Sequence, residues 1–115
     1  MKKFALLLAV VIILSVPMTA HAASRAMNII PKLSFNGTTA TCEATVLGDT
    51  TSDYIQVTMK LWNGNSCVAT WNGSGYGYVH LNKTASVAKG ITYDLTIDVV
   101  YKGVVKPTVT VTGTC

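Results

Sequence analysis

Apolar and polar residues alternate along most of the chain after position 26, which is the period of β-strands with one buried face. The clearest case is the segment 91–101, whose apolar positions share one face: Tyr93, Leu95, Ile97, Val99 and Tyr101. No segment of this part has the 3.6-residue period of an amphipathic helix. The pattern therefore predicts an all-β fold.

Turn-forming residues divide this pattern into about seven short strands. We expect strands at 27–35, 39–46, 54–62, 67–71, 78–84, 91–101 and 104–115. Glycine-containing turns separate them and are predicted at 36–37, 63–66, 72–75, 89–90 and 102–103. Pro31 and Pro107 have no backbone N–H, so we expect each at a sheet edge or a bulge. Short strands at intervals of about 8–12 residues predict a single two-sheet sandwich.

One short motif carries a family resemblance. Gly-Ile-Thr-Tyr-Asp-Leu at 90–95 precedes the long penultimate strand and resembles the tyrosine corner of immunoglobulin-like and fibronectin type III domains. The resemblance implies an immunoglobulin-like sandwich whose corner is fastened by the Tyr93 hydroxyl. The whole pattern also looks similar to small secreted Gram-positive proteins of unknown function, which implies a bacterial origin but no activity.

The N-terminus has the three parts of an export signal. Lys2 and Lys3 precede a run at 4–16 that is apolar apart from one serine, and Ala20 and Ala22 supply small residues at a cleavage point. We expect a signal-peptide helix at 1–22 and a secreted domain at 23–115. An uncleaved membrane anchor is disfavoured because a spanning helix needs about 20 apolar residues. No membrane association is expected after cleavage.

The basic excess does not indicate a nucleic-acid partner. The full chain has nine Lys and Arg against five Asp and Glu, a net charge of +4. Removal of Lys2 and Lys3 leaves seven against five, a net charge of +2, and no basic cluster remains. We therefore expect neither nucleic acid nor a membrane surface as a partner.

The three cysteines of the secreted domain lie where disulfides persist. Because the number is odd, at most one intramolecular bridge can form. Cys42 shares the parity of Ala44, and Cys115 shares that of Val111, so both should face the core. We predict a Cys42–Cys115 disulfide, with Cys42 to Cys67 as the alternative pairing, and Cys67 as the free thiol.

The register of the hairpin at 54–71 depends on two competing preferences. An even loop after Trp62, favoured by Asn63-Gly64, places Cys67 and Trp71 outside the sandwich. A three-residue loop places both inside. Exposing a tryptophan costs more than a poor turn residue. We therefore predict that Cys67 and Trp71 are buried, with Trp71 as a structural residue and Trp62 alone near the surface.

No catalytic constellation is evident. His80 stands on a polar strand face, and Asp94 and Asp98 are about 13 Å apart along their strand, too far for a glycosidase pair. Asp49 and Asp53 occupy a polar loop that could ligate calcium weakly, although turn formation explains the same residues more simply. We expect no enzyme activity, no cofactor and no metal site.

Aromatic side chains are the remaining candidates for function. Trp62, Tyr76 and Tyr78 could form a surface that binds a protein or a glycan, while the alternative is that tryptophans only fill the core. We expect a secreted, non-enzymatic binding or adhesion-type module that acts through its surface. A structural or assembly subunit, associating through an edge strand or a free cysteine, is the second hypothesis.

Overall fold

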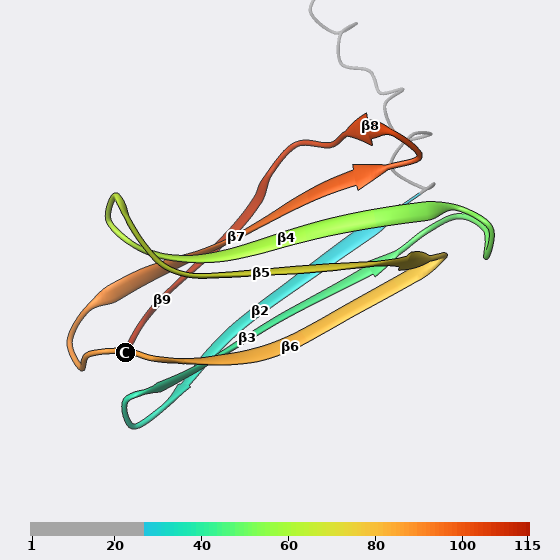
Figure 1. Ribbon diagram of the computed structural model, residues 1–115. Coiled ribbons are helices and arrows are strands. Elements are labelled where there is room, and N and C mark those ends of the chain that lie inside the picture. The colour runs from blue at the N-terminus through green and yellow to red at the C-terminus, as the bar shows by residue number, and fades with distance from the viewer. Residues whose placement is uncertain (1–26) are drawn as a thin grey trace, which may run out of the picture.

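The computed structural model describes residues 27–115, which form eight β-strands in two layers (Figure 1). The strands are β2 (Asn28–Asn36), β3 (Thr39–Leu47), β4 (Tyr54–Asn63), β5 (Ser66–Tyr76), β6 (Tyr78–Ser86), β7 (Thr92–Tyr101), β8 (Val104–Val105) and β9 (Val109–Thr114). The all-β, two-sheet fold predicted from the sequence is confirmed. The signal peptide predicted at 1–22 lies outside the described residues. Residues 27–115 include no helix long and apolar enough to span a membrane.

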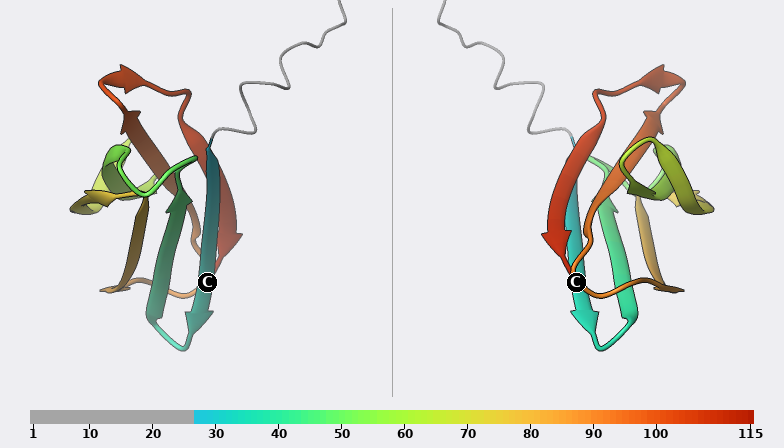
Figure 2. Two further views of the ribbon diagram at one scale, coloured as in Figure 1. Left: turned by 90° about the vertical axis from the view of Figure 1, so that its right-hand side faces the viewer. Right: turned by 90° about the vertical axis from the view of Figure 1, so that its left-hand side faces the viewer.

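Each sheet is antiparallel, and the two sheets face each other (Figure 2). The first has the order β2-β3-β6, and the second the order β5-β4-β7. β8 and β9 both pair with β7, β8 near its end and β9 along its first six residues. Pro107 lies between β8 and β9, and Pro31 lies on the edge strand β2. Pro31 therefore occupies the edge position expected of it. Pro107 lies in the segment 106–108, which belongs to no strand and divides the strand predicted at 104–115 into β8 and β9.

The core lies between the inward faces of the two sheets. β3 is central in the first sheet, and β4 and β7 are central in the second, so these strands supply most of the buried side chains. Their alternation is the one expected from the sequence. The buried hydrophobic residues are Ala40, Cys42, Ala44, Val46, Ile55, Val57, Met59, Leu61, Val79, Leu81, Tyr93, Leu95, Ile97, Val99 and Tyr101.

The β4–β5 hairpin has the even loop. Asn63 is opposite Ser66, and Gly64 in the two-residue loop has a φ of 60°, as a tight hairpin turn requires. Cys67 is consequently opposite Trp62 and is exposed. The prediction that Cys67 is buried is wrong, because the turn preference decides the register next to the loop.

A β-bulge then restores the apolar register further along β5. The pairing shifts between Leu61 and Trp62, so that Ala69 is opposite Leu61 and Trp71 is opposite Met59. Trp71, which was predicted to be buried, is half-buried and packs against the core. Because of the extra residue, the hairpin keeps its two-residue turn and Trp71 still faces the core.

β5 is longer than the sequence indicates. The turn expected at 72–75 is wrong, because β5 continues through these residues and the chain turns at Gly77. A Cβ atom on Gly73 would lie 2.7 Å from Leu81 Cδ2 of β6. Glycine lets the two sheets approach closely here, since any larger residue would have to displace the Leu81 side chain. In the sequence this glycine looks like a turn signal.

Tyr93 occupies the corner where the chain enters β7. Its side chain is buried, and its hydroxyl accepts a hydrogen bond of 2.9 Å from the backbone N–H of Ala88. This contact joins the start of β7 to the main chain five residues upstream.

Candidate functional site

Two exposed tyrosines meet at one end of the five-stranded sheet. Tyr54 begins β4 and lies opposite Tyr76, which ends β5. Their ring centroids are 5.1 Å apart with planes inclined by 48°, and the side chains are 40% and 66% exposed. We call Tyr54 and Tyr76 the tyrosine pair. Aromatic rings that stay this exposed are typical of binding surfaces.

An open depression of about 290 Å³ adjoins the tyrosine pair on the outer face of β4 and β5. The Thr58 hydroxyl donates a 2.9 Å hydrogen bond to Asn72 Oδ1. This contact fixes the orientation of the amide and presents its NH₂ group as a donor. No lining side chain is charged; the lining residues are Tyr54, Gln56, Val57, Thr58, Asn72, Gly73 and Ser74.

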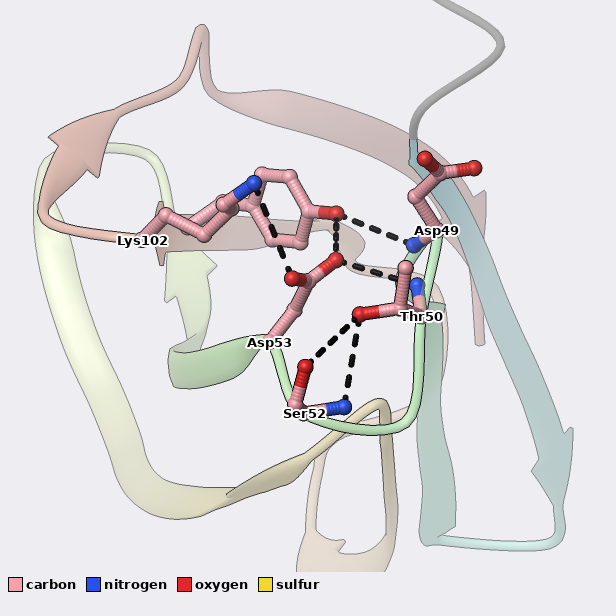
Figure 3. Close-up of polar contacts among 6 residues, drawn as sticks. Asp49, Thr50, Ser52, Asp53 and Lys102 are labelled. Carbon is pink, nitrogen blue, oxygen red and sulfur yellow. Dashed lines mark hydrogen bonds and ion pairs between the residues drawn. The ribbon is translucent and has the colours of Figure 1, made fainter.

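A buried carboxylate supports the loops around this site (Figure 3). Asp53 is only 6% exposed and accepts hydrogen bonds from the Tyr101 hydroxyl and from the Thr50 backbone N–H. Lys102 Nζ lies 3.6 Å from the other carboxylate oxygen. The Tyr101 hydroxyl in turn accepts a 2.9 Å bond from the Asp49 backbone N–H. The network joins the 48–53 loop to the end of β7.

The same contacts shift the pKa values of Asp53 and Tyr101. The hydrogen bond from Tyr101, together with those from Thr50, lowers the pKa of Asp53 to about 2. The bond to Asp53 raises the pKa of Tyr101 above its usual value. Asp53 is therefore a structural anion, and its oxygens are engaged by donors of this chain. Turn formation, the simpler of the two explanations considered for Asp53, agrees with this role.

Backbone hydrogen bonds fasten the tyrosine pair to this network. The Gly77 N–H donates to the Asp53 carbonyl at 2.7 Å, and the Lys102 N–H donates to the Tyr54 carbonyl at 3.0 Å. A Cβ atom on Gly77 would lie 2.7 Å from Thr51 Cα, so the β5–β6 corner packs directly on the 48–53 loop. The surface carrying the tyrosine pair is thus held in place by the main chain of the 48–53 loop and of Lys102.

The sequence grouped Trp62, Tyr76 and Tyr78, but the structure separates them. Tyr78 begins β6 on the outer face of the other sheet, where it stacks on His80 with centroids 6.5 Å apart. Trp62 is eight residues from Tyr54 along β4, about 26 Å away.

Trp62 has structural contacts of its own. Its indole N–H donates a 3.0 Å hydrogen bond to Thr96 Oγ1, and Lys60 Nζ lies 5.7 Å from the ring centroid. The side chain is half-buried. Of the predicted binding residues, only Tyr76 belongs to the tyrosine pair.

All three cysteines are free, so the predicted Cys42–Cys115 disulfide is not formed. The Cys115 thiol donates a 3.2 Å hydrogen bond to the Gly37 carbonyl in the β2–β3 turn. Cys42 lies three residues into β3 from Thr39, about 10 Å from that turn. The alternation of apolar residues predicts which face of the strand each cysteine occupies, but it does not predict whether the two cysteines lie at the same level along the strands.

Thiol labelling of the native protein should separate these cysteines. Cys67 is exposed and should be modified rapidly, whereas burial of Cys42 raises the pKa of its thiol to about 11 and disfavours the reactive thiolate. We expect Cys42 to react only after denaturant is added. Slow labelling of Cys67 in the native state would contradict the bulged hairpin.

The polar residues considered for catalysis make hydrogen bonds to neighbouring segments of the sheets. The His80 Nδ1 atom lies 2.9 Å from Thr45 Oγ1 on the neighbouring strand. Asp94 and Asp98 accept hydrogen bonds from Thr112 and Thr108, at 2.6 Å and 2.5 Å. Residues 27–115 contain no group of three or more metal-ligating side chains placed to hold an ion.

The comparison with known proteins gives no family. No protein-family model and no curated protein matches the chain.

Sequence reasoning overlooked Tyr54, although a signal was present. Tyr54 shares the outward parity of Gln56, Thr58 and Lys60, while its neighbours Ile55 and Val57 face the core. A large aromatic residue on the polar face of a strand is a candidate for surface contact. The depression could not have been found, because the register that sets Asn72 beside Thr58 depends on the bulge.

Proposed function

We propose that this chain is a secreted, non-enzymatic binding module whose ligand is an uncharged glycan, bound at the tyrosine pair and the adjoining depression. The observation that carries the proposal is the exposed Tyr54–Tyr76 pair beside a lining of uncharged amide and hydroxyl groups. Of the protein and glycan ligands considered from the sequence, this chemistry favours the glycan.

The physical complementarity is direct. A sugar ring has an apolar C–H face that can pack on an exposed aromatic ring, and hydroxyl groups at its rim that both donate and accept hydrogen bonds. Gln56 and Asn72 each offer amide groups, and Ser74 offers a hydroxyl. The lining has no Lys or Arg to neutralise an acidic sugar, which supports an uncharged ligand.

We also propose that the sandwich is immunoglobulin-like. In its first sheet, the neighbouring strands correspond to strands A, B and E of an immunoglobulin domain: β2, β3 and β6. In its second sheet, β4, β7 and β9 correspond to C, F and G, with β5 added beside C. The Tyr93 contact at the start of β7 supports the same assignment. Export is supported by the N-terminal signal pattern, which would deliver the module to the glycans outside the cell.

Replacing Tyr76 with alanine should abolish most glycan binding. We expect the exported protein to bind members of an array of neutral oligosaccharides, and Tyr76→Ala to lose at least about tenfold in affinity by titration calorimetry, because it removes the larger exposed ring surface of the pair. Tyr78→Ala is the matched control: Tyr78 is similarly exposed but lies on the other sheet, and its replacement should leave affinity unchanged.

Two results would contradict the proposal. One is the absence of binding to any neutral oligosaccharide on the array while the protein is folded. The other is an equal loss of affinity in Tyr76→Ala and Tyr78→Ala.

A further inference from the structure

β5 forms an open edge of the five-stranded sheet. Among residues 27–115 it pairs with β4 alone, from Ser66 to Tyr76 apart from the bulged Val68. None of its eleven residues is charged and none is proline. An edge strand presents a row of unpaired N–H and C=O groups, and proteins usually guard such a row with prolines, charges or covering segments.

The other edges of the sandwich have these guards. β2 carries Pro31 and Lys32. β6 carries Lys83 at an inward position, opposite the buried Cys42, yet the lysine is exposed. An inward-pointing lysine on an edge strand is a known device against strand pairing.

β9 is covered rather than charged. A Cβ atom on Gly113 would lie 3.0 Å from the Phe35 ring of β2, so β2 packs against this edge. β8 is only two residues long. β5 also packs its inner face on β6, since a Cβ atom on Gly73 would lie 2.7 Å from Leu81 and one on Gly75 would lie 2.8 Å from the Tyr78 carbonyl oxygen. It is nevertheless the longest edge strand among residues 27–115, with eleven residues that include neither a charge nor a proline, and only β4 pairs with its backbone.

We propose that β5 pairs antiparallel with β5 of a second copy of the chain, around a two-fold axis at Asn72. A second copy fits because the strand has no charge that would face a like charge when it pairs with itself. The inference goes beyond the proposed glycan binding and does not depend on it.

The register follows from the bulge and from the glycines. The bulge near Cys67 limits the regular part of β5 to 69–76. Opposed residues of such a pair lie on the same sheet face, so the axis passes through a residue. An axis at Asn72 pairs seven residues and places a pair of Asn72 side chains opposite each other at its centre. An axis at Gly73 would oppose two glycines at its centre, where no side-chain pair could form.

Charge reversal at the axis tests this pairing. Sedimentation equilibrium of the exported protein, in reducing buffer and without glycan, should show a reversible dimer between about 10 µM and 1 mM. Asn72→Lys and Asn72→Asp should each weaken the dimer about fivefold, because like charges face each other across the axis. A 1:1 mixture of the two variants should dimerise at least as tightly as the unaltered protein, because each mixed pair opposes unlike charges.

Thr110→Lys is the matched control, because Thr110 on β9 lies on the opposite edge of the same sheet. It should leave the dimer unchanged, as should Tyr76→Ala, which separates this proposal from glycan binding. The proposal is overturned if the protein is monomeric at 1 mM, or if the mixture gives no rescue. It is also overturned if reductant or Cys67→Ser dissolves the dimer, since a Cys67 disulfide would then be the link.

Discussion

Gly77→Ala should destabilise the domain by about 2–4 kcal/mol and remove glycan binding with it. Gly77 has a φ of 76°, which costs alanine on the order of 1–2 kcal/mol. The added Cβ would also meet the backbone of the 48–53 loop, 2.7 Å from Thr51 Cα and 3.0 Å from the Thr50 carbonyl oxygen. Because those atoms belong to the main chain, relief requires the corner to move away from the loop. Urea unfolding, followed by circular dichroism, measures the loss.

Gly37→Ala is the control that has the cost of a positive φ but no steric clash of the added Cβ. Gly37 has a similar φ of 63° in the β2–β3 turn, but its Cβ would meet nothing within 4 Å. We expect it to cost only about 1 kcal/mol and to leave glycan binding intact. Equal destabilisation by the two substitutions would refute the docking of the β5–β6 corner on the 48–53 loop.

Asp53→Asn should lower the melting temperature by about 5–10 °C at pH 7. Asparagine keeps the shape of Asp53 but loses the charged acceptor for the Tyr101 hydroxyl and the ion pair with Lys102. The folded-state pKa of Asp53 is about 2, below the ordinary 3.8. Its contribution is therefore complete above pH 4 and declines as the pH falls from about 4 through 2. The difference between the two proteins should shrink over that range in calorimetric melting curves.

Asp49→Asn is the control for this pH dependence. Asp49 takes part in the network through its backbone N–H, and its carboxylate points away from Asp53 (Figure 3). We expect a melting temperature within about 1 °C of the unaltered protein at pH 7. A difference between Asp53→Asn and the unaltered protein that stays constant from pH 7 to pH 2 would argue against the lowered pKa of Asp53.

The alternation along the chain was enough to predict the two-sheet core, because period-two burial leaves each strand only one register with an apolar inward face. The prediction from alternation failed where a glycine serves packing instead of a turn, and where a bulge adds one residue to a strand. The bulge after Cys67 allows the hairpin both its two-residue turn and an inward-facing Trp71. From the sequence pattern, these two features excluded each other. Gly73 and its neighbours looked like a turn because close packing and tight turns both select glycine.

The site itself was only partly predictable. Tyr76 was recognised as a surface candidate, but its partner Tyr54 comes from a strand whose pairing partner depends on the bulged register. Asp53 gave no signal of burial, since its partner Tyr101 is 48 residues away in the sequence. Long-range contacts of this kind arise from the way loops at one end of the sandwich meet, which strand periodicity does not encode.

Nuclear magnetic resonance titration tests the central claim most directly. The tightest-binding neutral oligosaccharide of the array is added to ¹⁵N-labelled protein, and amide and side-chain shifts are followed by residue. The account predicts that the largest changes fall on Tyr54, Gln56, Asn72, Ser74 and Tyr76, with the Asn72 side-chain NH₂ among them. Changes centred on the outer face of the other sheet, around Leu47 and Tyr78, would contradict it.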